Sequence, residues 1–150
     1  MLEVLTMRSF KLSAIVVLGA CTASAGSGDA ASDLTLAVEP ATVAAGDSVT
    51  LILGNESASA IGYNLCTSSL ERQTDGSWQP LPSDRVCTME LRTLEPGAQT
   101  RYPLSLPAAL ESGEYRYRTT VELMETGERR DVESEVFRVG SGPTRSASAP

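Results

Sequence analysis

Short runs of alternating apolar and polar residues fill the chain between Asp33 and Val139, and Gly, Pro and Asp interrupt them about every ten residues. This pattern is typical of half-buried β-strands joined by turns, because successive side chains on a strand point to opposite faces. Alternation is clearest from Leu34 to Val38, from Val49 to Leu53 and from Tyr115 to Leu123. No segment carries the apolar period of an amphipathic helix. The sequence therefore predicts an all-β domain of seven or eight antiparallel strands over residues 33–139.

Turn residues divide this region into strands. The run Thr74-Asp75-Gly76 predicts a hairpin, because Gly tolerates the positive φ that a tight hairpin turn needs. A strand is expected from Val86 to Leu94, and Pro103 suits an edge strand because it has no N–H to donate to a neighbour. Further turns are expected at Gly46-Asp47, Glu95-Pro96-Gly97 and Thr126-Gly127-Glu128.

The pattern Leu110-x-x-Gly113-x-Tyr115-x-Tyr117 resembles the tyrosine corner of immunoglobulin-type domains. By this resemblance Tyr115 is the corner residue, and Tyr117 stands where antibody domains carry their second cysteine. Nearly all of the region from Asp33 to Val139 is similar to the bacterial immunoglobulin-like (Ig-like) domains of secreted and lipid-anchored proteins. The resemblance implies an Ig-like β-sandwich, and it implies no catalytic set. Its other motifs are Gly46-Asp47-x-Val-Thr-Leu, Asn55, Leu70-Glu71-Arg72, Asp75-Gly76-x-Trp78 and Leu94-x-Pro96-Gly97.

The amino-terminal segment has the pattern of an export signal over residues 1–20. Basic residues after Met7 precede an apolar run from Leu12 to Ala20, which is shorter than the roughly 20 residues of a membrane-spanning helix. We expect translation to begin at Met7, because Glu3 places an acid in the otherwise basic leader.

The residues Leu18-Gly19-Ala20-Cys21 resemble the lipobox of bacterial lipoproteins. The resemblance implies cleavage before Cys21 and a diacylglycerol on its thiol, which tethers the chain to a membrane. Thr22 follows the cysteine, which favours the outer membrane if the cell has two membranes. The alternative is an ordinary secretory signal that is cleaved after Ala20 or Ala23. We expect residues 21–32 to be a flexible linker and residues 140–150 a disordered tail, since both are rich in Ser, Gly and Ala.

Lipidation of Cys21 leaves Cys66 and Cys87 as the two remaining cysteines. Export delivers them to an oxidising compartment, so a disulfide is expected. It closes a loop of about 20 residues and contributes about 3 kcal/mol in the chain-entropy model. A redox role is disfavoured because no Cys-x-x-Cys motif is present.

Composition excludes several classes of function. The formal net charge of −7 argues against nucleic-acid binding, which needs a basic surface. The chain has no histidine, which excludes Ser–His–Asp and Cys–His catalysis, and three cysteines cannot supply a zinc site. No Asp-x-Asp-x-Asp run is present for calcium. We expect no metal, no cofactor and no enzymatic activity.

Three residues are candidates for binding. Trp78 follows the Asp75-Gly76 turn, where it either closes an edge of the core or presents its ring to a sugar or peptide. Arg116 and Arg118 lie on the strand face opposite Tyr115, so they either pair with acids across the sheet or contact a ligand.

Two functional hypotheses follow. The first is a lipid-anchored, non-catalytic Ig-like module of the bacterial cell envelope that binds a protein or glycan partner by strand addition or loop contacts. The second is an exported protease-inhibitor-like domain. Its candidate loops are Asn55–Gly62 and Leu81–Arg85, and neither carries a recognisable inhibitor motif.

Overall fold

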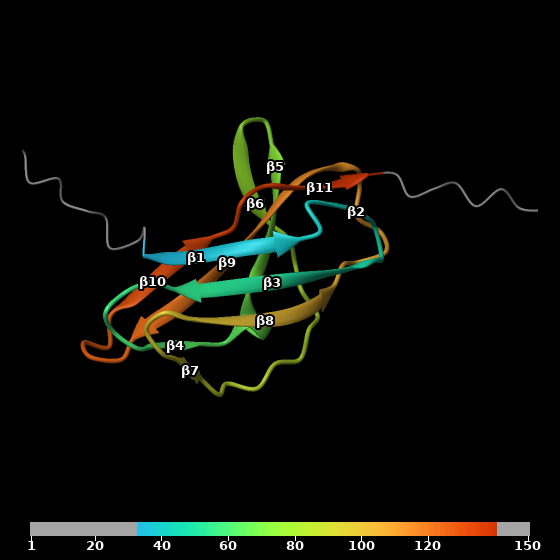
Figure 1. Ribbon diagram of the computed structural model, residues 1–150. Coiled ribbons are helices and arrows are strands. Elements are labelled where there is room, and N and C mark those ends of the chain that lie inside the picture. Colours follow the sequence, from blue (N-terminus) through green and yellow to red (C-terminus); the bar gives the residue numbers. More distant parts are fainter. Residues whose placement is uncertain (1–32, 141–150) are drawn as a thin grey trace, which may run out of the picture.

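The computed structural model describes residues 33–140, which form two β-sheets packed face to face (Figure 1). The smaller sheet is antiparallel and has the strand order β1-β3-β8. Its strands are β1 (Leu34–Glu39), β3 (Ser48–Asn55) and β8 (Ala98–Ser105). The expected Ig-like β-sandwich is thereby confirmed. The expected signal peptide, Cys21, the linker and residues 141–150 lie outside the described residues.

The larger sheet is built around its longest strand, β9 (Gly113–Leu123). Strands β4 and β5 pair with successive parts of one side of β9, and β10 and β11 pair with successive parts of the other side. A short 3-10 helix, Leu65–Thr67, separates β4 from β5, and residues 134–136 separate β10 from β11. Together with the break at residues 40–41, these interruptions divide the described part of the chain into eleven strand segments, where seven or eight continuous strands were expected. The remaining segments are β2 (Thr42–Ala44), β4 (Ile61–Tyr63), β5 (Ser69–Thr74), β6 (Ser77–Pro80), β7 (Arg92–Leu94), β10 (Arg129–Glu133) and β11 (Phe137–Gly140).

The core lies between the two sheets and follows the alternation of the sequence. On β9, Tyr115, Tyr117 and Val121 point inward and are buried, whereas Arg116 and Arg118 take the outer face. Phe137 stacks on Tyr117, with 5.9 Å between ring centroids, and lies 6.0 Å from the ring of Tyr115. Only a few large rings are available, so most of the remaining core consists of Leu, Val and Ile. Burial of these aliphatic side chains is the main stabilising term.

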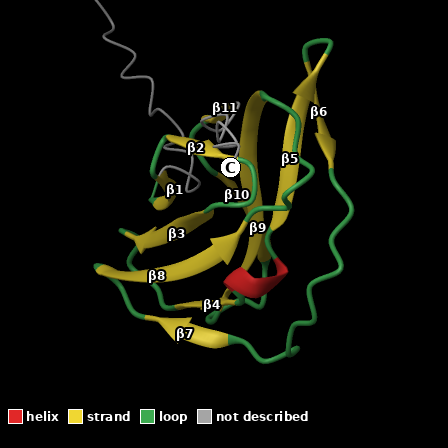
Figure 2. Ribbon diagram, turned by 90° about the vertical axis from the view of Figure 1, so that its right-hand side faces the viewer, coloured by secondary structure: helices red, strands yellow, loops and turns green. Residues whose placement is uncertain are grey.

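The Asp75-Gly76 hairpin is confirmed. Strands β5 and β6 pair antiparallel around these two residues, whose φ angles of 50° and 80° are both positive. A two-residue turn with this geometry matches the twist of the flanking strands, and Gly76 adopts it at no steric cost. The hairpin projects beyond the rest of the larger sheet (Figure 2).

The expected strand from Val86 to Leu94 is wrong over most of its length. Only Arg92–Leu94 forms a strand, and residues 81–91 cross between β6 and β7 as a loop with neither a turn nor a bend (Figure 2). Among residues 33–140 no strand pairs with this segment, and Val86 and Met89 are exposed to solvent. The apolar residues that suggested a strand are therefore exposed.

Pro103 lies on the free edge of β8, as expected. The bond from the Leu106 N–H to the Asp47 carbonyl sets the register, so the backbone of Pro103 faces away from β3. The missing N–H costs no hydrogen bond there and discourages pairing with another strand. No helix within residues 33–140 is long and apolar enough to cross a membrane.

Candidate functional site

Tyr115 closes the corner between β8 and β9. Its hydroxyl donates a 2.7 Å hydrogen bond to the backbone carbonyl of Glu111, four residues earlier, while its ring packs in the core. Burial raises the pKa of the Tyr115 hydroxyl, so the group remains a neutral donor at physiological pH. This is the geometry of a tyrosine corner, which fixes the approach of the chain to its central strand.

Replacing Tyr115 by phenylalanine is expected to lower the free energy of unfolding by about 1 kcal/mol, because one partly buried hydrogen bond is lost while the ring is kept. Urea unfolding measures the change. Tyr117→Phe is the matched control, since its hydroxyl has no hydrogen-bond partner among the described residues. Equal effects of the two substitutions would show that the corner hydrogen bond contributes nothing.

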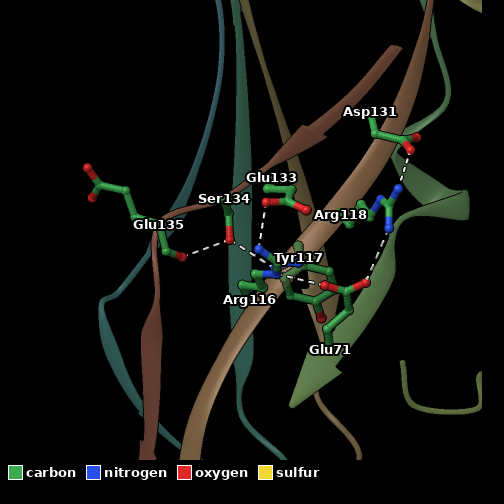
Figure 3. Close-up of polar contacts among 8 residues, drawn as sticks. All are labelled: Glu71, Arg116, Tyr117, Arg118, Asp131, Glu133, Ser134 and Glu135. Atoms are coloured by element: carbon green, nitrogen blue, oxygen red, sulfur yellow. Dashed lines mark hydrogen bonds and ion pairs between the residues drawn. The ribbon is translucent and has the colours of Figure 1, made fainter. Parts of the chain in front are cut away.

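The outer face of the larger sheet carries a cluster of ion pairs, which we call the outer-face cluster (Figure 3). At its centre Arg116 lies directly across the strands from Glu71 and donates to it from Nε at 2.7 Å. The same guanidinium reaches Glu133 on β10 at 2.5 Å. The Glu71 side chain, which contacts both Arg116 and Arg118, is only 6% exposed. Arg116 therefore ties three strands together.

Arg118 continues the cluster towards the end of β10. It pairs with Asp131 and lies 3.9 Å from Glu71. Thr120 also donates to Asp131, at 2.7 Å, and these two hydrogen bonds hold the pKa of the Asp131 carboxyl below its usual value. Arg118 is thus engaged by protein acids on both sides.

Trp78 joins the outer-face cluster from β6. The Arg116 guanidinium lies 4.6 Å from the centroid of the indole ring, which is a cation–π contact. The ring is half-buried and lies outside the core between the sheets. Sequence reasoning thus singled out Trp78, Arg116 and Arg118, and the structure brings all three together. The guanidinium groups of Arg116 and Arg118 are already paired with acids of the sheet, so the outer-face cluster stabilises the larger sheet.

A second surface is formed by Leu81–Leu91, which we call the pinned loop. Cys87 in this loop is bonded to Cys66, which confirms the expected disulfide. Asn64 donates from Nδ2 to the carbonyl of Thr88 at 2.6 Å. Arg85 turns inward and donates to the carbonyl of Ser68 at 2.6 Å. Three successive parts of the loop are therefore fixed to the segment around the 3-10 helix.

The pinned loop presents apolar side chains to solvent. Val86 is 98% exposed and Met89 is 90% exposed, and Leu91 is about half exposed. Hollows lie on both sides of the loop, one of about 250 Å³ towards β8 and one of about 160 Å³ towards β9. The loop is consequently a ridge between two depressions. Exposed apolar residues on a rigid element are typical of an interaction surface.

Sequence reasoning missed Val86, Met89 and Asn64. It placed Val86 in a strand and ended the candidate inhibitor loop at Arg85. The available signal was Cys87 with the apolar residues Val86 and Met89 close to it, in a stretch whose alternation is that of a strand. The other candidate loop is Asn55–Gly62. It is fixed by the side chain of buried Asn55, which donates to the carbonyls of Ser59 and Leu94.

Two packed sheets, a tyrosine corner and an intersheet aromatic core define an immunoglobulin-like β-sandwich. The model of a family described as bacterial Ig-like domain matches residues 30–136, and the chain belongs to this family. Members are generally non-catalytic modules.

Similarity to solved structures is distant. A structural-genomics target designated SoR45 is 16% identical, with 63% of this chain and 70% of that chain covered and a TM-score of 0.46. The archaellum periplasmic stator protein FlaG from Sulfolobus acidocaldarius is 20% identical, with 67% and 98% covered and a TM-score of 0.38. The DNA glycosylase AlkC from Pseudomonas fluorescens is 16% identical, with 73% and 31% covered and a TM-score of 0.40. No curated protein matches the sequence.

Proposed function

We propose that this chain is a lipid-anchored, non-catalytic binding module of the bacterial cell envelope, and that it engages a protein partner through the pinned loop. The observation that carries the proposal is the exposure of Val86 and Met89 on a loop fixed by a disulfide. Covering these two nearly fully exposed apolar side chains with a partner removes apolar surface from water, which favours binding. A rigid loop loses little conformational entropy on binding, which favours affinity.

The chemistry of the pinned loop favours a protein over a glycan. Its exposed side chains are aliphatic or thioether groups, whereas aromatic faces are the usual apolar contacts for sugars. One face of the Trp78 indole is already occupied by Arg116. Strand addition is also disfavoured at β8, because Pro103 interrupts its free edge.

The lipid anchor is tested by processing in the native host. Wild-type precursor is expected to incorporate a labelled fatty acid and to accumulate when the lipoprotein signal peptidase is blocked. The variant Cys21→Ser removes the acceptor thiol and is expected to incorporate no label. Processing of the wild type without lipid incorporation would refute the anchor.

The binding surface is tested by photo-crosslinking in intact cells. A photoreactive amino acid in place of Met89 is expected to give a discrete adduct with one protein, and Val86→Ser in the same chain is expected to weaken it. Ser77, exposed on the β5–β6 hairpin away from the loop, is the control position and is expected to give no adduct. Adducts of equal yield from positions 77 and 89 would contradict the proposal.

A further inference from the structure

We infer that the partner is a serine protease with an apolar primary specificity pocket, and that the pinned loop occupies its active-site cleft in the manner of a substrate, with Met89 in the pocket. This inference rests on the proposed function and names its partner. Three properties of the loop carry it: its path, its anchoring and the side chain at its most exposed position.

The path of the pinned loop matches what a protease cleft accepts. Serine proteases bind peptides in an extended conformation, and the side chain before the cleaved bond enters the primary pocket. Residues 81–91 run without a turn or a bend, and hollows on both sides make the segment a ridge. A convex segment that is held in neither a turn nor a helix can enter a concave cleft, whereas a hairpin tip such as Asp75-Gly76 cannot present its backbone in this way.

Anchoring of the loop separates an inhibitor from a substrate. The disulfide at Cys87 lies two residues before Met89, and Asn64 holds the carbonyl of Thr88, the residue immediately before Met89. A segment tied by these two links loses less conformational entropy on binding than a free segment, which favours affinity. The same fixation opposes the rearrangement that hydrolysis requires. If the bond is cut, these two links hold the end at Met89, and the pairing of Arg92 with Tyr63 holds the chain that follows Glu90.

The side chain of Met89 defines the protease class. It is unbranched, uncharged and 90% exposed, so it can enter a deep apolar pocket without rearrangement of the loop. A pocket with an acidic base, as in trypsin, selects Lys or Arg instead. On the amino-terminal side of Met89, the nearest charged residue of the loop is Arg85. Its guanidinium is turned inward and donates to the Ser68 carbonyl, so it is not available to such a pocket.

Slow cleavage of the pinned loop by the protease breaks one defined bond. Hydrolysis of the peptide bond between Met89 and Glu90 consumes one water and gives a carboxylate on Met89 and an amino group on Glu90. Cys66 and Cys87 both precede this bond, so the two fragments separate under denaturing conditions without reduction. The cut form is therefore distinguishable from the intact inhibitor by mass.

The test measures inhibition of chymotrypsin and subtilisin by the full chain carrying Cys21→Ser, which keeps it free of lipid. We expect reversible competitive inhibition, with at most slow cleavage at Met89–Glu90. Met89→Lys is expected to weaken inhibition of chymotrypsin by about 30-fold and to create inhibition of trypsin, because the residue in the pocket sets specificity. Val136→Lys places the same charge on an exposed apolar residue between β10 and β11 and is expected to change neither.

Three results would overturn the inference: absence of inhibition of both enzymes, rapid cleavage of the loop as an ordinary substrate, or inhibition that Met89→Lys leaves unchanged. Different results would contradict the proposed function and the choice of a serine protease as its partner. A position-89 adduct with a protein that is not a protease would remove the inference and leave the binding module, whereas absence of any adduct in cells would remove the binding module itself.

Discussion

Replacing Arg116 by alanine is expected to lower the free energy of unfolding by about 3 kcal/mol or more, because it leaves a buried carboxylate without its partner. The Glu71 side chain is only 6% exposed and accepts its closest charged hydrogen bond from Arg116 Nε at 2.7 Å. After the substitution the nearest cation is Arg118, at 3.9 Å. The Arg116 contacts with Glu133 and the Trp78 ring are lost as well. Urea unfolding with two spectroscopic probes measures the change.

Two matched variants show whether burial is the cause. Arg101→Ala removes an ion pair with Glu39 whose side chains are 56% and 58% exposed, so its effect is expected to be below about 1 kcal/mol. The double variant Glu71→Leu/Arg116→Leu removes both charges and is expected to recover most of the lost stability. If Arg116→Ala and Arg101→Ala have the same effect, the buried pair has no special role.

The sequence predicts the sandwich well because its alternation reports burial directly. Tyr115 and Tyr117 point into the core and Arg116 points out, as the period of two requires. The Asp75-Gly76 hairpin is equally predictable, since positive φ at both positions restricts the residues that can occupy them. Local backbone chemistry and side-chain alternation thus carry most of the fold.

The pinned loop could not be predicted in the same way. Cys87, Met89 and Leu91 alternate with polar residues, a pattern that a single sequence does not distinguish from a half-buried strand. What decides between the two is the absence of a neighbouring strand, which depends on how distant parts of the chain pack. The anchoring contact from Asn64 to Thr88 spans 24 residues and is likewise set by tertiary structure.

The outer-face cluster could be predicted only in part from the sequence. Alternation places Arg116 and Arg118 on one face, and acids are frequent on the neighbouring strands. The sequence could not show that Glu71 is their shared partner, because this requires the register in which Glu71 lies opposite Arg116. A shift of one residue in this register would turn Glu71 to the core face.

The second large effect is expected from removing the disulfide. The double variant Cys66→Ser/Cys87→Ser opens a link between residues that are 21 apart in sequence, and the chain-entropy model gives a loss of about 3 kcal/mol in the free energy of unfolding. Substituting both cysteines avoids a free thiol. Urea unfolding of the oxidised wild type and the double variant measures the loss, and a change below about 1 kcal/mol would contradict it.

The same variant has a local effect that global stability does not explain. Without the bond at Cys87, the segment around Met89 is held only by contacts such as the Asn64–Thr88 hydrogen bond, so it opens more often than the sheets do. We expect chymotrypsin to cut the double variant within residues 82–91 at concentrations that leave the wild type intact. Arg116→Ala, which is destabilised to a similar degree but keeps the disulfide, is the control and is expected to resist cleavage at this loop under native conditions. Equal cleavage of the two variants at the loop would mean that global unfolding, and not the disulfide, governs its susceptibility.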